Sequence, residues 1–354
     1  MRRVRSIVWL SLLCSAATGC DKAGPPDASS TAAPKDRAPS PVAEPTVVAK
    51  AEPQGDATPL PPQTTIAPRD PTKLPAAARI VAIGDVHGDF DATLRVLKLA
   101  GAIDDSRQWT GGELVVVQTG DQLDRGDGEQ QIVDLFEALR PQARAAGGWV
   151  LALNGNHEIM NAQGDLRYVT PGGFSDFEDA IDPALKDRPM LAKAPPEVRA
   201  RLAAFLPGGP YAKILASRNV AVIVGDTAFV HGGIRPPVAS AGLDALNAET
   251  SDWLAGAGSP PPTSLLDSEG PIWSRTYSAD TDAADCADLN QSLETLGVER
   301  MVVGHTVQAQ GINSACDGKV WRIDVGLASH YGSAPAQALE IMGDQVRVLV
   351  GDPT

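Results

Sequence analysis

Residues 79–88 read RIVAIGDVHG, an apolar run that ends in a polar cluster. The run is short, rich in β-branched side chains and followed directly by Gly84, which is typical of a buried strand that stops at a tight turn. Asp85 and His87 come next, and ligand sites in α/β sheets lie outside the carboxyl ends of strands. This stretch therefore predicts a buried strand with metal-binding or catalytic side chains at its end.

Similar apolar runs alternate with helical patterns along the chain, which indicates an α/β layered fold. The last two runs flank Gly343-Asp344 and predict a hairpin. Further strands are expected at 113–119, 149–153, 220–230, 301–303, 320–323, 338–342 and 345–350, and helices at 92–99, 129–145 and 287–296.

The chain divides into a leader, a linker and one large domain. Residues 21–77 contain 13 prolines and 12 alanines, and no aromatic residue occurs between Trp9 and Phe90, so this stretch has little with which to build a core. We expect a disordered linker at 21–77 and a catalytic domain at 78–354. A proline-rich segment with one short helix near 198–205 indicates an insertion at about 162–218, which would form a cap facing the substrate.

The leader at 1–20 predicts export from the cytoplasm. Three arginines precede an apolar run at 7–17, which is too short to cross about 30 Å of hydrocarbon. The following residues, ATGC, resemble the cleavage box of bacterial lipoproteins, in which Cys20 would be lipidated; the alternative is an ordinary secretory signal. We therefore expect a protein of the bacterial cell envelope, periplasmic, that contacts a membrane only through an N-terminal lipid anchor.

Charge and cysteine content narrow the choice of partners and compartment. The formal net charge is −14, and because residues 1–77 carry nine basic and seven acidic side chains, the remainder carries −16. Such a field disfavours nucleic acid as a partner. Cys286 and Cys316 form an even pair in the predicted domain, and the sequence leaves open a disulfide or two separate buried thiols.

Five polar blocks at strand ends contain four of the five histidines of the chain. A single block of this kind is usually an ordinary turn. Carboxylate oxygens and imidazole nitrogens are also the ligands of divalent metals, so five such blocks together predict a metal centre. The blocks are GDVHG at 84–88, GDQLDRG at 120–126, GNHE at 155–158, HGG at 231–233 and GH at 304–305.

These blocks, in this order, resemble the motifs of the calcineurin-like metallophosphoesterases, in particular the phosphoprotein phosphatase family. The resemblance spans 79–330 and implies an α/β sandwich of two central mixed β-sheets flanked by helices. The insertion and the phrase PGGP at 207–210 resemble the Shewanella-like protein phosphatase branch.

The resemblance also implies a dinuclear centre of two divalent ions, Mn, Fe or Zn, with a bridging hydroxide as the nucleophile. The implied ligands are Asp85 and His87 for the first ion, Asn156, His231 and His305 for the second, and Asp121 as the bridge between them.

Other residues of the same blocks match catalytic positions of the family. His157 would be the general acid, and Asp124 would orient its imidazole. Arg125, Arg275 and Asn156 would bind the substrate phosphate. For Arg275, which stands in a W-x-R block, the alternative is an ordinary surface arginine.

Two further residues have weaker signals. Glu158 follows the expected general acid and would support the ligands, or it is a surface carboxylate. His330 could line the rim of the site, although an unrelated surface position is the preferred interpretation.

These observations predict a dinuclear metal-dependent phosphomonoesterase, a protein phosphatase acting on phosphotyrosine, phosphoserine or phosphothreonine. Its partner would be a phosphorylated protein or a small phosphoester. One alternative is a hydrolase of small phosphoesters or diadenosine polyphosphates, and another is a non-catalytic metal-binding envelope lipoprotein.

Overall fold

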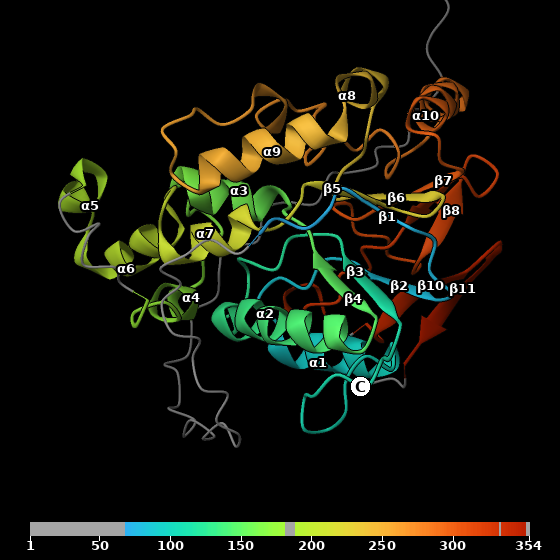
Figure 1. Cartoon of the computed structure of the whole chain (residues 1–354). Helices are drawn as coiled ribbons and strands as arrows, with labels where there is room; N and C mark the ends of the chain where they lie inside the picture. The colour runs from blue at the N-terminus through green and yellow to red at the C-terminus, as the bar shows by residue number, and fades with distance from the viewer. Residues whose placement is uncertain (1–67, 181–187, 333, 352–354) are drawn as a thin grey trace, which may run out of the picture. The chain divides into compact units, whose positions relative to one another are not determined.

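Two β-sheets form the centre of the chain in the computed structural model, which describes residues 68–180, 188–332 and 334–351 (Figure 1). All of these belong to one unit, Asp56–Thr354. The five-stranded sheet has the order β11 (Gln345–Val350), β10 (Gln337–Met342), β2 (Ile80–Ile83), β3 (Val115–Gln118), β4 (Trp149–Ala152). The six-stranded sheet has the order β1 (Lys73–Leu74), β5 (Ala221–Val224), β6 (Thr227–Val230), β7 (Arg300–Val303), β9 (Val320–Arg322), β8 (Asn313–Ala315).

Alternating side chains on each strand bury both faces of the sheets, as β-geometry requires. On β2, Ile80 and Ala82 pack between the sheets with Phe229 of β6, while Val81 and Ile83 point to the other face, against helices. This explains why the strands are continuous apolar runs rather than polar–apolar alternations. The predicted α/β sandwich is confirmed.

Helices cover the outer faces of the two sheets (Figure 1). α1 (Phe90–Leu99) and α2 (Glu129–Ala145) pack on the five-stranded sheet. α8 (Pro236–Ala241), α9 (Leu243–Leu254) and α10 (Ala283–Leu296) pack on the six-stranded sheet. Two 3-10 turns, η2 (Thr263–Leu265) and η3 (Ser329–Tyr331), complete the connections. Among the described residues, no helix combines the length and the apolar character needed to cross a bilayer.

The segment predicted as an insertion is more helical than its prolines suggested. The expected helix near 198–205 is α6 (Pro196–Phe205), but the segment also forms α4 (Pro171–Ser175), α5 (Pro189–Lys193) and α7 (Pro210–Ala216), and it follows α3 (Asn156–Gln163). Each of the four helices α4 to α7 has proline as its first residue, a position where the missing N–H costs no hydrogen bond.

Two further predictions differ from the structure. The run at 220–230 is two antiparallel strands, β5 and β6, because Gly225 takes a φ of 60° and reverses the chain. The predicted linker reaches to residue 77, yet β1 pairs in parallel with β5 and Leu74 is buried, so the folded domain begins before residue 78. The expected leader and Cys20 lie outside the described residues.

The sheet topology brings the polar blocks to one edge. β2, β3 and β4 are parallel neighbours, as are β6, β7 and β9. Blocks that follow these strands therefore emerge together at the carboxyl ends of both sheets, although they are far apart in the sequence.

Candidate metal centre

Asp121 lies at the centre of the converging blocks. Its Oδ2 atom is 3.2 Å from Nε2 of His231, 3.8 Å from Nε2 of His87 and 3.7 Å from Nε2 of His157. These side chains are all buried. One carboxylate thus faces imidazoles from three different strand ends, which is the arrangement expected of a bridging ligand.

The remaining predicted ligands complete two groups around Asp121. Nε2 of His231 is 2.9 Å from Oδ1 of Asn156 and 3.1 Å from Nδ1 of His305. Oδ2 of Asp85 is 3.9 Å from Nε2 of His87, and the Asp85 carboxylate accepts the backbone N–H of His305 at 3.2 Å. The structure therefore brings all six predicted ligands together.

The donor set fits divalent metal ions. Two triads, His87–Asp121–His157 and Asp121–His231–His305, each offer ligand atoms within 4.8 Å of one another. Nε2 of His305 is buried and makes no hydrogen bond within the described structure. Nitrogen and carboxylate donors in this number suit Mn, Fe or Zn.

Local backbone geometry at the site is strained. Left-handed φ values are costly for residues with a Cβ and cluster at functional sites. Of the eight non-glycine residues with positive φ in the described ranges, five are predicted metal-binding or catalytic residues: His87, Asp121, Asp124, Arg125 and His305.

Two motif glycines leave room for the carboxylates. A Cβ on Gly155 would lie 2.3 Å from Oδ1 of Asp121, and a Cβ on Gly304 would lie 2.5 Å from Oδ1 of Asp85. Any other residue at either position would displace the carboxylate beside it.

Burial and mutual charge shift the pKa values of the ligands in opposite directions. Burial raises the pKa of Asp85 well above its usual range. Burial also opposes ionisation of Asp121, but His231 and His157 outweigh it and hold the pKa of Asp121 well below its usual range. Burial lowers the pKa of His231, but the carboxylate of Asp121 outweighs burial and raises this pKa to about 9. For His305, burial and the neighbouring His231 act together and lower the pKa to about 2. A divalent cation would release the His231 proton on binding.

Glu158 is a fully buried support for the ligand loops, so its interpretation as a surface carboxylate is wrong. Its two oxygens accept four backbone N–H groups, those of Gly155 at 2.7 Å, Asp121 and Gln122 at 2.8 Å, and Leu123 at 3.2 Å. Burial raises its pKa, and these N–H donors act against that rise.

His157 and Asp124 form a buried pair. Nδ1 of His157 donates to Oδ2 of Asp124 at 2.5 Å, which leaves Nε2 directed toward Asp121 and the metal cluster. Oδ1 of Asp124 accepts from Asn161 and from Arg201 of α6, both at 3.0 Å. Asn161 and Arg201 lie outside the five polar blocks, and no motif predicted them; the one sequence signal for Arg201 was a charge within the small and apolar run ARLAAF.

Arg125 stands at the open side of the cluster. Its guanidinium donates to Nε2 of His87 at 2.6 Å and to the hydroxyl of Tyr331, and it lies 5.2 Å and 5.5 Å from the ring centres of Tyr168 and Tyr331. A hollow of about 430 Å³ is lined by Arg125, Tyr168, Tyr331 and the exposed His330, so His330 lies at the rim of the site and its interpretation as an unrelated surface position is wrong.

Arg275 lies beside the second triad. Its guanidinium donates to the carbonyl oxygen of His305 at 3.0 Å and to the hydroxyl of Thr306 at 2.8 Å. An arginine at this position, exposed yet anchored next to a ligand, could reach a phosphate above the cluster.

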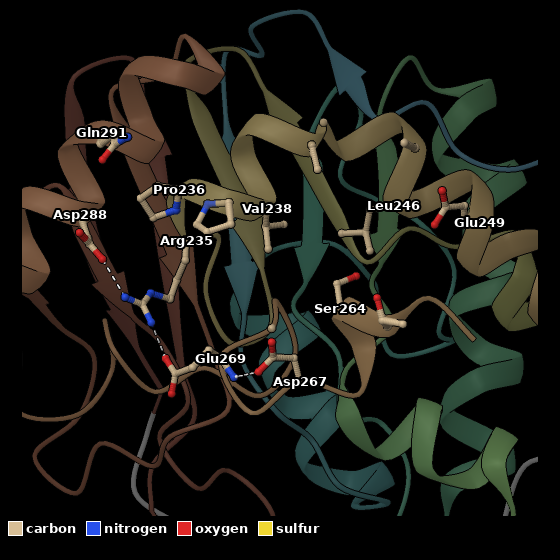
Figure 2. A pocket seen from close by; sticks show the side chains of 16 residues that line it. Arg235, Pro236, Val238, Leu246, Glu249, Ser264, Asp267, Glu269, Asp288 and Gln291 are labelled. Atoms are coloured by element: carbon tan, nitrogen blue, oxygen red, sulfur yellow. Dashed lines mark hydrogen bonds and ion pairs between the residues drawn. The ribbon is translucent and has the colours of Figure 1, made fainter. Parts of the chain in front are cut away.

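A separate groove of about 700 Å³ lies along α8, α9 and η2 (Figure 2). None of its lining residues is a predicted ligand. Arg235 forms ion pairs with Glu269 at 2.7 Å and with Asp288 of α10 at 2.8 Å. Because Arg235 closely follows the HGG block, these ion pairs fix the loop that carries His231.

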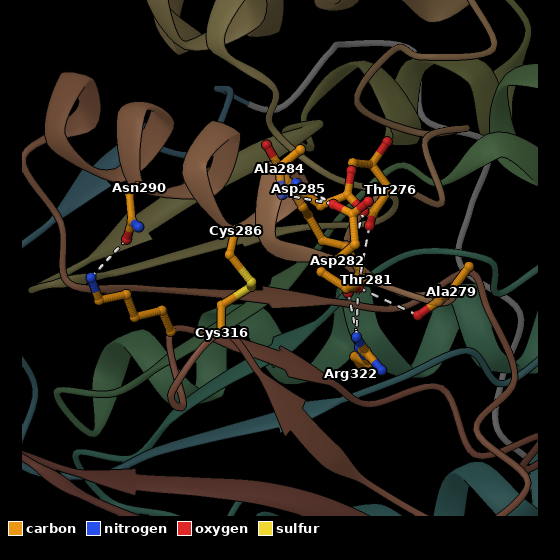
Figure 3. The surroundings of a disulfide bond; sticks show 12 residues. Thr276, Ala279, Thr281, Asp282, Ala284, Asp285, Cys286, Asn290, Cys316 and Arg322 are labelled. Atoms are coloured by element: carbon orange, nitrogen blue, oxygen red, sulfur yellow. Dashed lines mark hydrogen bonds between the residues drawn. A yellow bond between two sulfur atoms is a disulfide. The ribbon is translucent and has the colours of Figure 1, made fainter.

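Cys286 and Cys316 are joined by a disulfide (Figure 3). The bond connects α10 to the turn between β8 and β9, and thus ties a covering helix to an edge of the six-stranded sheet. Of the two alternatives that the sequence left open, the structure has the disulfide.

Comparison with known proteins agrees with the geometry. Residues 78–309 match the model of the calcineurin-like phosphoesterase family. The chain is 39% identical to Shewanella-like protein phosphatase 2 of Arabidopsis thaliana over 80% of each chain. It resembles a solved cold-active protein tyrosine phosphatase with a TM-score of 0.65 and 29% identity, over 79% of this chain and 78% of that one. A cold-active protein-tyrosine phosphatase from a psychrophilic Shewanella gives 0.63 and 28%, over 80% and 83%.

Proposed function

Because the chain belongs to the calcineurin-like phosphoesterase family, and is therefore a metal-dependent phosphoester hydrolase, we propose that it is a protein phosphatase that hydrolyses phosphomonoesters. The observation that carries this proposal is the His157–Asp124 pair beside the six converging ligands, with Arg125 at the opening.

The proposed division of labour follows from what each side chain can do. Asp85, His87, Asp121, Asn156, His231 and His305 would hold two divalent cations, which, when bound, supply Lewis acidity and activation of the attacking water. Asp124 accepts a hydrogen bond from Nδ1 of His157, which leaves Nε2 as the ring nitrogen that can give a proton to the substrate. From there His157 would protonate the leaving oxygen.

Arg125 and Arg275 would bind the substrate phosphate from two sides. A guanidinium offers paired N–H donors that match phosphate oxygens. Their positions beside the first and second triads support this role, because a phosphate over the cluster would lie between them.

The rim favours phosphotyrosine as the substrate residue. Tyr168 and Tyr331 are 44% and 39% exposed, although both contact the site: the Tyr168 ring is 5.2 Å from that of His157, and the Tyr331 ring 5.8 Å from that of His87. Exposed rings beside the phosphate-binding arginine could pack on a phenol ring, which phosphoserine lacks. The tyrosine phosphatase activity named for the two solved relatives supports the same choice.

We also propose a location in the cell envelope. The disulfide supports an oxidising compartment, and the leader at 1–20 supports export. Fractionation of the producing cells tests this: the wild type should be in the membrane fraction and Cys20→Ala in the soluble periplasm. A wild-type protein in the cytosol would contradict the proposal.

The deciding experiment measures phosphate release by the full chain, stripped of metal and reloaded with Mn²⁺. Substrates are matched phosphotyrosine, phosphoserine and phosphothreonine peptides and diadenosine tetraphosphate. We expect metal-dependent turnover with phosphotyrosine preferred, and its loss in His157→Asn. Turnover of the dinucleotide alone would make the protein a nucleotide hydrolase, and no turnover with Mn²⁺, Fe²⁺ or Zn²⁺ would favour a binding role.

A further inference from the structure

Arg201 is a fully buried arginine of α6. Its guanidinium donates to the side-chain oxygen of Asn161 and the carbonyl oxygen of Gly173, both at 2.8 Å. It also donates to Oε2 of Glu129 at 2.5 Å and to Oδ1 of Asp124 at 3.0 Å. One side chain from the insertion therefore joins α2, α3, α4 and the loop after β3.

The contact with Asp124 completes an arrangement that fixes this carboxylate. Oδ2 accepts from His157, whereas Oδ1 accepts from Arg201 and Asn161. A rotation of the carboxylate would break hydrogen bonds at both oxygens. The backbone of Asp124 has a left-handed φ of 67°, a costly conformation that persists only where surrounding contacts such as these hold it.

Stability alone is a weak explanation for this network. A buried ion network is often no more stabilising than well-packed apolar side chains of similar volume. Two aromatic rings also flank Arg201, those of Phe177 and Phe205, with their centres 5.3 Å and 5.4 Å from its guanidinium carbon. Here the cation is directed at the partner of the expected general acid, which points to a part in catalysis.

We propose that Arg201 is a positioning residue for the general acid: it acts through Asp124 to aim the protonated Nε2 of His157 at the leaving oxygen. The inference rests on the proposed function. In the step concerned, the oxygen of a water molecule bonds to phosphorus and its protons stay with the phosphate product, while the ester P–O bond breaks and the leaving oxygen takes the Nε2 proton of His157. The insertion is then part of the catalytic apparatus as well as a cap.

The test uses the dependence of rate on the leaving group. Phenolate needs a proton when it leaves, and 4-nitrophenolate needs one far less. A defect in the general acid therefore slows the hydrolysis of phenyl phosphate more than that of 4-nitrophenyl phosphate. With the Mn²⁺-loaded full chain, we expect Arg201→Met to lower kcat/KM for phenyl phosphate about tenfold more than for 4-nitrophenyl phosphate, within the range that general acids contribute. The 4-nitrophenyl reaction also reports on metal loading.

Matched variants separate positioning from folding. Arg140→Met removes another buried arginine, which bonds Asp70, Glu137 and Ser217 and does not contact Asp124, so it should lower the two rates by equal factors. If Arg201→Met does not fold, the double variant Arg201→Met/Glu129→Gln removes the cation together with its buried partner. Arg201→Lys should recover part of the phenyl phosphate rate, because its single ammonium cannot serve every acceptor.

His157→Asn distinguishes the possible failures. It should lower kcat/KM for phenyl phosphate, relative to that for 4-nitrophenyl phosphate, by at least as large a factor as Arg201→Met does. If the wild type turns over neither substrate, the proposed function fails and the inference with it. If the wild type turns over both but His157→Asn slows them equally, the phosphatase activity stands, His157 is not the general acid, and the inference is overturned. If His157→Asn discriminates but Arg201→Met and the double variant do not, Arg201 only holds the fold and the inference is overturned.

Discussion

The carboxylate of Glu158 accepts the backbone N–H of Asp121 at 2.8 Å, so a residue from the start of α3 fixes the loop after β3 that carries the central ligand. The same carboxylate also accepts the N–H of Gly155. Two neighbouring strand ends are thereby held at a constant separation, and the metal cluster lies across them.

This arrangement predicts that replacing Glu158 with the isosteric glutamine strongly weakens metal binding. Glu158→Gln replaces one acceptor oxygen with an N–H₂ group that would face backbone donors, so the Asp121 loop must shift. We expect Mn²⁺ affinity, measured by titration calorimetry, to fall by about 10- to 100-fold, as is typical when an outer support of a metal site is lost. Glu178→Gln, an exposed glutamate of the insertion, should bind Mn²⁺ like the wild type. Equal affinities in the two variants would contradict the role given to Glu158.

The exposed tyrosines at the rim predict a substrate-dependent effect. Tyr168→Ala and Tyr331→Ala should each lower kcat/KM for a phosphotyrosine peptide about five- to tenfold, the size of one aromatic contact, and change phosphoserine turnover less. Tyr331→Phe keeps the ring and removes only the hydroxyl that accepts from Arg125, so it should keep the preference. A uniform loss on both peptides would mean that the rings position Arg125 instead of contacting substrate.

The disulfide predicts a stability that depends on redox state. Cys286 and Cys316 are 30 residues apart, and closing a loop of that size stabilises a fold by about 3.6 kcal/mol on the chain-entropy account. The double variant Cys286→Ala/Cys316→Ala should unfold at lower urea concentration, and dithiothreitol should lower the midpoint of the wild type but not that of the variant. Neither α10 nor the turn between β8 and β9 carries a predicted ligand, so phosphate release at low temperature should be kept.

Glu129 predicts a pH dependence of stability. Burial raises its pKa from 4.5 to about 8, and this outweighs the opposing effect of Arg201. The folded chain therefore binds this proton more tightly than the unfolded chain, and the free energy of unfolding should decrease as pH rises from about 4.5 to about 8.

The measurement is urea unfolding at several pH values for the wild type and Glu129→Gln. Across that window the free energy of unfolding of the wild type should fall by on the order of a few kcal/mol more than that of the variant. A contribution from Asp176 should remain in both proteins, because burial raises its pKa to about 6. Parallel pH profiles would show that Glu129 stays ionised beside Arg201.

The sequence was sufficient to predict the ligand cluster, because each block is local and parallel strands bring local blocks to one edge. It was insufficient for Arg201, which meets Asp124 across 77 residues through the packing of α6. That contact depends on which face of a short helix is buried, and the pattern of α6 does not distinguish its faces, since nearly all of its second half is buried.

The helices of the insertion were hidden for a different reason. Pro171 and Pro189 looked like interruptions of structure, but both stand at the first position of a helix, where proline is favoured. β1 spans only two residues, Lys73 and Leu74, which is too short for a periodic signal. Proline-rich composition therefore marked neither a lack of helices within the insertion nor the N-terminal boundary of the folded domain.

The pairing of β1 with β5 sets a limit on how far the chain can be shortened from its N-terminus. Asp70, just before β1, is 3% exposed and forms ion pairs with Arg140 at 3.0 Å and Arg144 at 2.9 Å. A recombinant fragment that started at residue 78 would lack both the strand and this carboxylate. A protease that removed the same residues would bare the backbone of β5 as a sheet edge, and an uncovered edge of this kind is a template for aggregation.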